Sequence, residues 1–156
     1  MPQLLLWAGG AIGLIVLAGF LSLVIRNARS TRPDDLGVVD GRLRPCPASP
    51  NCVCSQDADA EHADEPLRFT GTPAEAIQRL KSVIEQMPRT EIVTAEPDYL
   101  HAEFTTPLMR YVDDVEFVIE PEAQLIQFRS ASRIGYSDLG ANRKRMAAIR
   151  AAFEQR

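Results

Sequence analysis

The sequence predicts an α+β protein: a two-layer domain in which an antiparallel sheet of about four to five strands carries two helices on one face, preceded by an N-terminal transmembrane helix. Three observations lead to this prediction. Residues 1–25 contain no charged side chain, two later stretches show helical apolar periodicity, and short alternating stretches joined by tight turns lie between them. We therefore divide the chain into a transmembrane anchor at 1–25, a linker at 26–45 and an α+β domain at 46–156.

The N-terminal segment has the length of a membrane span. Residues 4–25 are an unbroken run of 22 apolar, Gly and Ser residues, which as a helix would cover about 33 Å of a hydrocarbon core about 30 Å thick. A cleaved signal peptide is the alternative, but it normally has a basic start and a shorter apolar core. We expect a retained single-pass anchor in a bacterial inner membrane, with the lipid bilayer as its partner. Arg26, Arg29 and Arg32 follow the run, and the positive-inside rule then predicts a cytoplasmic domain.

The first half of the domain combines a loop, a short strand and a helix. Residues 46–66 are rich in Pro, Asn, Ser and Asp and predict an ordered loop, and a short strand is expected at 67–70. A capping-box sequence with Pro at the first helical position begins at Thr72. Apolar residues at helical spacing continue from there until Pro88 ends the helix.

The second half predicts an antiparallel meander followed by a helix. Short connections between alternating stretches favour antiparallel pairing. The four predicted strands lie at 91–95, 99–106, 114–120 and 124–130. A polar loop at 132–140 then leads into a helix from about 139 to 154, with its apolar residues on the inner face.

Charge and motifs exclude several classes of function. The 17 basic and 21 acidic side chains give a net charge of −4, and the basic residues are spread along the chain, so a nucleic-acid partner is not expected. The sequence has no nucleophile elbow, no zinc-protease motif and no nucleotide-binding glycine loop. We assign no catalytic residue, no metal and no cofactor, and the pattern favours a protein that is not an enzyme without settling the question.

Three cysteines lie close together in the predicted loop. Cys46–Cys52 would close a seven-residue disulfide loop, which would persist in an oxidising compartment. Two alternatives stay open from the residues alone, namely reduced inert thiols and a zinc site completed by His62 or His101. Cys52 and Cys54 are spaced too tightly for the usual zinc knuckle.

A histidine is surrounded by acidic residues in the predicted sheet. Alternation from Tyr99 places His101 and Glu103 on one face, and Asp113, Asp114 and Glu116 near the start of the next strand approach them. Such a group suits acid–base or divalent-metal chemistry. The alternative, which we favour, is a solvated sheet face with cross-strand charges.

The densest polar segment predicts an anion-binding site where the last strand passes into the last helix. Exposed backbone N–H groups and the helix dipole favour an anion there, and arginines supply bidentate contacts. The alternative is an internal network of paired Arg and Asp side chains. The predicted ligand-binding residues are Asp113, Asp114, Arg129, Ser130, Ser132, Arg133, Tyr136, Asn142 and Arg143.

Two of these stretches resemble the family called domain of unknown function 1499. The similarity lies in residues 46–56 and in the run from Asp113 to Arg143, with 99–103 in addition, and it extends over about residues 36–155. Family members resemble lipoproteins and lumenal proteins, which implies an extracytoplasmic, periplasmic domain, against the arginines after the apolar run. The resemblance also implies that Cys46 and Cys52 are the disulfide pair, because Cys54 stands where the family has Ser. It implies no catalytic residues.

The sequence therefore predicts a membrane-anchored envelope protein whose domain is a non-catalytic binding or structural module. Its partner would be an envelope protein or a small anionic ligand. The alternative is an enzyme that acts on a small anionic substrate, with His101 as base and Arg129, Arg133 and Arg143 as the anion cluster.

Overall fold

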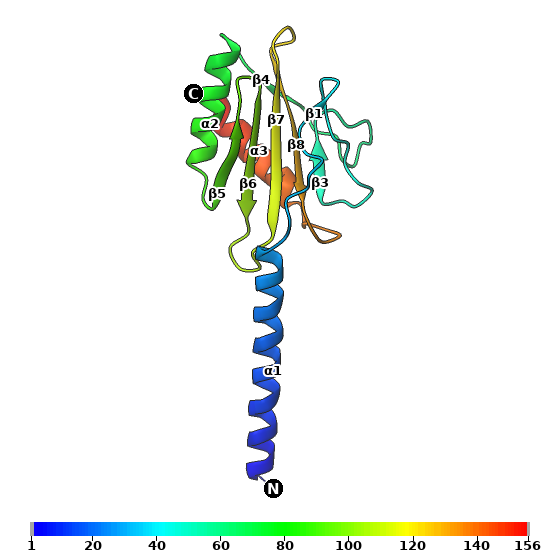
Figure 1. Cartoon of the computed structure of the whole chain (residues 1–156), viewed down its shortest axis with the longest axis vertical. Helices are drawn as coiled ribbons and strands as arrows, with labels where there is room; N and C mark the ends of the chain where they lie inside the picture. The colour runs from blue at the N-terminus through cyan, green and yellow to red at the C-terminus, as the bar shows by residue number, and fades with distance from the viewer. Residues whose placement is uncertain (1, 156) are drawn as a thin grey trace.

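An antiparallel sheet of six strands is the centre of the α+β fold (Figure 1). The computed structural model describes the backbone of residues 2–155 and the side chains of residues 13–155. The sheet order is β3-β8-β7-β6-β5, with β4 also paired to β8. Its strands are β3 (Cys52–Cys54), β4 (Leu67–Arg68), β5 (Thr90–Ala95), β6 (Tyr99–Thr105), β7 (Val112–Glu120) and β8 (Leu125–Ser132).

Two helices cover one face of this sheet (Figure 1). They are α2 (Pro73–Glu85) and α3 (Ala141–Glu154). The predicted capping box at the start of α2 is confirmed, since the Thr72 hydroxyl accepts from the Glu75 N–H and the Glu75 carboxylate accepts from the Thr72 N–H. The apolar core lies between helices and sheet, with Leu80, Phe117 and Phe128 among its fully buried side chains.

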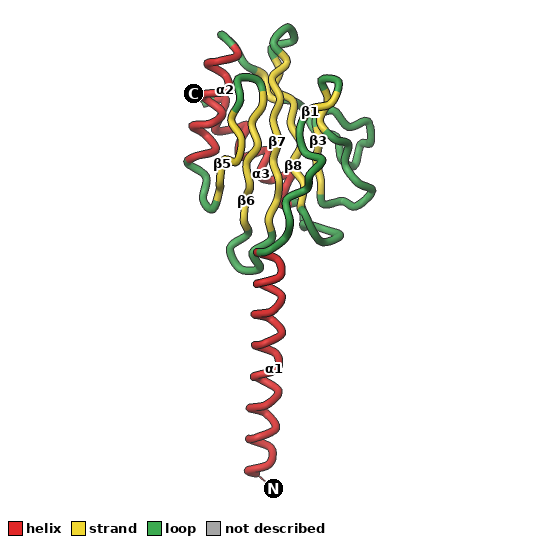
Figure 2. The backbone as a smooth tube through the Cα atoms, viewed as in Figure 1, coloured by secondary structure: helices red, strands yellow, loops and turns green. Residues whose placement is uncertain are grey.

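The opposite face of the sheet is also covered. The chain between residues 29 and 45, here called the covering segment, runs upward across this face after α1 and contains the small hairpin of β1 (Val38–Val39) and β2 (Arg42–Leu43) (Figures 1 and 2). As a result β7 is buried along its whole length except at Glu120. A strand buried on both faces explains why charged residues within it are shielded from solvent.

The predicted number of strands is wrong. Cys52–Cys54 belongs to the stretch that we expected to be a loop, but it forms β3 by pairing with residues 129–131 of β8. Turn-forming residues on both sides of this three-residue strand hide it from pattern analysis, because a strand so short shows no alternation. The conformation of β3 is fixed by its pairing with β8, a longer and buried strand.

The prediction of an N-terminal transmembrane helix is also wrong. Helix α1 (Pro2–Ala28) is present, but among the residues described no helix combines the length and the apolar character needed to cross a bilayer. The side chains of residues 2–12, where the predicted span begins, lie outside the described residues.

Candidate functional site

The register between β6 and β7 gathers polar side chains on the face beneath the covering segment. Glu103 lies opposite Asp114, and His101 lies opposite Glu116. His101, Asp114 and Glu116 are all buried, with exposed fractions of 3%, 2% and 0%. The predicted grouping of His101 with carboxylates is therefore present, but the face is not solvated, because the covering segment lies over it.

Arg133 neutralises the carboxylates of this face. Its Nε donates to Asp114 Oδ2 at 2.8 Å and its Nη2 donates to Asp114 Oδ1 at 2.8 Å, a bidentate arrangement. Nη2 also contacts Glu103 Oε1, and Nη1 donates to the Ser30 carbonyl of the covering segment at 3.2 Å. Arg32 of the covering segment donates to Glu103 Oε1 at 2.6 Å. We call Arg32, His101, Glu103, Asp114 and Arg133 the charge cluster.

The charge cluster shifts the pKa values of its own members. Burial acts to raise the pKa of Asp114, but hydrogen bonds from Arg133 and His101 outweigh it, so this pKa is lowered. Burial acts to lower the pKa of Arg133, and the bonds to Asp114 and Glu103 outweigh it, so this pKa is raised. Both groups are therefore held in their charged forms.

His101 is oriented by Asp114. Its Nε2 lies 2.8 Å from Asp114 Oδ1, and a carboxylate is only an acceptor, so Nε2 carries the proton of this bond. Nδ1 makes no hydrogen bond to any residue that the structure describes. In the neutral imidazole this nitrogen is a free acceptor.

Three possible metal ligands meet in the charge cluster. Atoms of His101, Glu103 and Asp114 lie within 4.8 Å of one another. The Arg133 guanidinium, however, contacts both carboxylates and supplies the positive charge that a divalent ion would bring. The arrangement is therefore suited to holding the arginine and the histidine in place.

A second buried ion pair lies next to the charge cluster. Glu116 Oε1 accepts from the Gly37 N–H at 2.7 Å and from the Tyr99 hydroxyl at 2.9 Å, while Arg129 Nη1 lies 3.6 Å from Glu116 Oε2. Burial and the Glu116 carboxylate raise the pKa of Tyr99, so it stays a phenol. Burial lowers the pKa of Arg129, although Glu116 opposes this shift. Glu116 thereby ties the covering segment to the sheet.

A cavity of about 500 Å³ lies between the covering segment and the β5–β6 edge of the sheet. Residues 32–34 and 36–38 line one side of it, and β5 and β6 line the other. His101 belongs to its lining, with the rest of the charge cluster next to it. Its full lining is Arg32, Pro33, Asp34, Leu36, Gly37, Val38, Val93, Thr94, Glu96, Asp98, Tyr99, His101 and Val118.

The predicted ligand-binding residues are divided between the two faces of the sheet. Asp114, Arg129 and Arg133 lie under the covering segment, whereas Asp113 points toward α3 and contacts Arg145. Two further residues of the set lie on the helix side with it. Ser130 and Ser132 both bond to Asn142.

Asn142 is the centre of this helix-side network. Its Nδ2 donates to the Asn51 carbonyl at 2.9 Å and to Ser132 Oγ at 3.2 Å. Its Oδ1 accepts from Ser130 Oγ at 2.6 Å and from Arg145 Nη1. Asn142 is fully buried, so its hydrogen-bonding groups join β8, α3 and the cysteine loop and are not open to a ligand.

Two residues of the predicted set join neither network. Arg143 donates to the carbonyls of Glu61 and Ala63 and lies 3.6 Å from Asp64. Tyr136 is 75% exposed. The structure thus brings only part of the predicted anion site together. Its arginines are already paired with carboxylates, Arg129 with Glu116 and Arg133 with Asp114 and Glu103.

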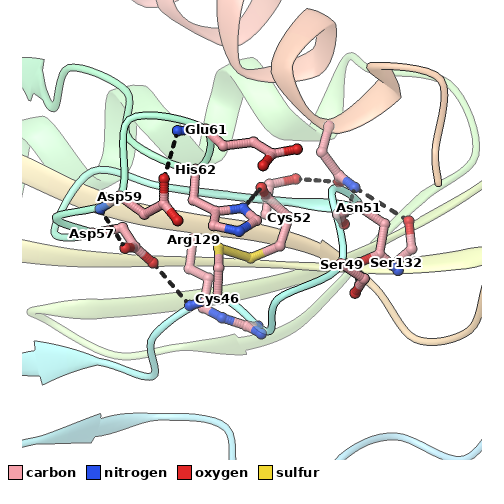
Figure 3. Close-up of a disulfide and its surroundings, with 12 residues drawn as sticks. Cys46, Ser49, Asn51, Cys52, Asp57, Asp59, Glu61, His62, Arg129 and Ser132 are labelled. Atoms are coloured by element: carbon pink, nitrogen blue, oxygen red, sulfur yellow. Dashed lines mark hydrogen bonds between the residues drawn. A yellow bond between two sulfur atoms is a disulfide. The ribbon is translucent and has the colours of Figure 1, made fainter. Parts of the chain in front are cut away.

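The cysteine loop is closed by a disulfide. The predicted Cys46–Cys52 bond is confirmed, with the two Cα atoms 5.7 Å apart. Cys54 is free and buried, and burial raises the pKa of its thiol. The carbonyl of Cys52 lies 3.0 Å from His62 Nδ1, and the Cys46 N–H donates to Asp57 Oδ2 at 3.0 Å (Figure 3). Because two of the three thiols form the disulfide, the zinc alternative is wrong.

Arg129 connects the disulfide to the polar face. Its side chain lies next to the Cys46–Cys52 bond (Figure 3), and β3 pairs with β8 such that Cys54 is opposite Arg129. Arg129 Nε is buried without a hydrogen-bond partner among the described residues. Arg129 is 2% exposed, so its pair with Glu116 is shielded from solvent.

Sequence reasoning missed Arg32 and Arg145. Arg32 lies in a linker without strand or helix pattern, so no spacing places it over Glu103. Arg145 carries a signal, since it lies three residues after the buried Asn142 and therefore on the same side of α3.

We predict that Arg133→Met lowers the free energy of unfolding by about 3–5 kcal/mol, because it leaves Asp114 buried without its counter-charge. In the wild type, the lowered pKa of Asp114 contributes stability that is present above the usual Asp pKa and is lost as pH falls through the lower folded value. In the variant this loss should begin at higher pH. Urea unfolding at a series of pH values measures both effects.

The matched control for this prediction is Arg143→Met. Arg143 is 45% exposed at its side chain and bonds to carbonyl groups on the surface, so its loss should cost less than about 1 kcal/mol. Equal effects of the two substitutions, with the same pH dependence, would contradict the role given to Arg133.

Reduction of the Cys46–Cys52 bond should lower the free energy of unfolding by about 2 kcal/mol, from the entropy of a seven-residue loop. Urea unfolding of the wild type with and without reductant measures this difference. Cys54→Ala should keep the difference, and the double variant C46A/C52A should lose it. A wild type that unfolds identically under both conditions would show that the bond does not stabilise the domain.

The comparisons with known proteins agree with the family resemblance of the sequence. No curated protein and no solved structure matches the chain. The family model described as "Protein of unknown function (DUF1499)" matches residues 42–153, a range that contains all strands of the main sheet together with α2 and all of α3 except Glu154. The chain therefore belongs to the DUF1499 family of proteins of unknown function.

Proposed function

We propose that this domain is a non-catalytic binding module that holds a small molecule in the cavity between the covering segment and the β5–β6 edge. The observation that carries the proposal is the free Nδ1 of His101, a buried residue in the lining of a cavity of about 500 Å³. Cavities of this size are typical of small-molecule sites.

The charge cluster supports binding because it fixes His101 before any ligand arrives. Asp114 holds the ring through Nε2, and Arg133 holds Asp114 through two hydrogen bonds. A polar group whose position is set in advance loses little freedom when a ligand binds.

Two observations favour binding over catalysis. No hydroxyl or thiol among the described residues is hydrogen-bonded to Nδ1 of His101, so the ring has no paired nucleophile. The arginines of the enzyme alternative do not line this cavity, and Arg133 is already bound to Asp114 and Glu103. An anionic substrate therefore has little support here.

We expect the full-length protein to bind fragments from a mixed library of neutral, cationic and anionic compounds, and Thr94→Trp to abolish that binding by filling the cavity. Thr94 is half-buried, lines the cavity and lies opposite His101 in the sheet. Ligand-observed NMR measures binding. Thr70→Trp, at an exposed position outside the lining, is the matched control and should bind as the wild type does. Absence of any bound fragment, or binding unaffected by T94W, would overturn the proposal.

We also propose that the domain works outside the cytoplasm. The support is the Cys46–Cys52 disulfide, because such bonds persist in oxidising compartments and are rare in reducing ones. Arg32, one of the three arginines that suggested a cytoplasmic domain, bonds to Glu103 and so has a structural role.

Thiol labelling in cells tests this location. If cells are quenched in acid, denatured and alkylated, we expect one labelled thiol per chain, that of Cys54, and none in a Cys54→Ala variant. Three labelled thiols in the wild type would place the domain in a reducing compartment instead.

A further inference from the structure

We propose that the cavity selects a small organic ammonium ion whose charged nitrogen is attached directly to an apolar body. This inference rests on the proposed binding function and names its ligand class. It comes from three features of the lining: unpaired carboxylates, the free ring nitrogen of a buried histidine and a group of apolar side chains.

The carboxylates give the cavity a negative lining. Asp34 contributes from the covering segment, and Glu96 and Asp98 contribute from the β5–β6 turn. The side chains of all three make no ion pair or hydrogen bond to the residues that the structure describes. Arg32, the basic side chain of the described lining, is paired with Glu103. The uncompensated charge favours a cation.

His101 provides the independent observation. It is 3% exposed, it belongs to the lining, and its Nδ1 has no partner within the described part of the chain. In the neutral imidazole, Nδ1 accepts a hydrogen bond, as do the carboxylates. The free carboxylates and this nitrogen all accept hydrogen bonds, so a ligand group with several N–H donors and no acceptor suits them, and an ammonium group has this composition.

The apolar lining defines the rest of the ligand. Leu36 and Val38 come from the covering segment, and Val93 and Val118 come from the sheet. These side chains match a hydrocarbon body of a few carbons. An ammonium carried close to a phosphate, as in a phospholipid headgroup, would bring an anion to the same carboxylates, so we infer a free amine.

We expect hexylammonium chloride to bind the full-length protein at least about tenfold more tightly than 1-hexanol or sodium hexanoate, which have a similar body with a neutral or a negative end. Two-dimensional NMR titration, followed at the amides of Thr94, His101 and Val118, measures the three affinities. Binding of hexylammonium should also weaken as salt is added, whereas binding of hexanol should not.

The double variant E96Q/D98N should lower hexylammonium affinity by about tenfold, because two exposed charge contacts are removed, and should leave hexanol affinity unchanged. Both residues are exposed, so the substitutions should not impair folding. The matched control is Glu122→Gln, an exposed acid in the β7–β8 turn outside the lining.

The outcomes separate the two proposals. Hexanol or hexanoate binding as tightly as hexylammonium, or an unchanged affinity in E96Q/D98N, overturns the ammonium inference and leaves the binding module standing. Absence of binding by all three probes, together with a negative fragment screen, overturns both.

Discussion

The bidentate contact between Arg133 and Asp114 is the interaction on which the polar face of this domain depends. A carboxylate that is 2% exposed is costly unless a counter-charge and hydrogen bonds accompany it. Arg133 supplies both, and the same guanidinium reaches Glu103 and the Ser30 carbonyl. The side chain of Arg133, directly after β8, thus links β6, β7 and the covering segment. It also fixes the Asp114 carboxylate, which in turn holds His101.

Burial of this face separates the domain from an ordinary two-layer α+β structure. In a two-layer fold one side of the sheet normally faces water and carries charges that need no pairing. Here the covering segment lies over that side, and Glu116 bonds to its Gly37 N–H. The cavity is formed where the covering segment passes the β5–β6 edge, so the same ionic contacts that hold the segment also define the candidate site.

The disulfide lies near the opposite edge of the sheet, where β3 pairs with β8. It closes the loop from which β3 emerges, and β3 completes the pairing of β8 at the position of Arg129. Arg129 and Glu116 are therefore enclosed between a covalently fixed loop and the covering segment. Two separate pieces of irregular chain, one fixed by a covalent bond and the other by ionic contacts, enclose the polar face of the sheet.

How much of this follows from the sequence depends on the range of the interactions. The start of α2 is predictable because Thr72 and Glu75 are three residues apart and act locally. The alternation that groups His101 with Glu103 is also local. Asp113 and Asp114 were assigned to one site, although adjacent residues of a strand must point to opposite faces. Arg32 and β3 could not be placed, because their partners lie 71 residues away at Glu103 and on β8, and no pattern near them encodes that contact.

The state of the two ring nitrogens of His101 tests the account most directly, because the candidate site depends on a proton held at Nε2 and a free Nδ1 on a residue that lines the cavity. Long-range ¹H–¹⁵N NMR of the full-length protein, recorded over a pH series with and without hexylammonium, reports both nitrogens. The account predicts a ring whose Nε2 carries the proton shared with Asp114, with an Nδ1 resonance that moves when hexylammonium is added. A neutral ring protonated at Nδ1, or an Nδ1 resonance that does not respond to any of the three probes, would contradict it.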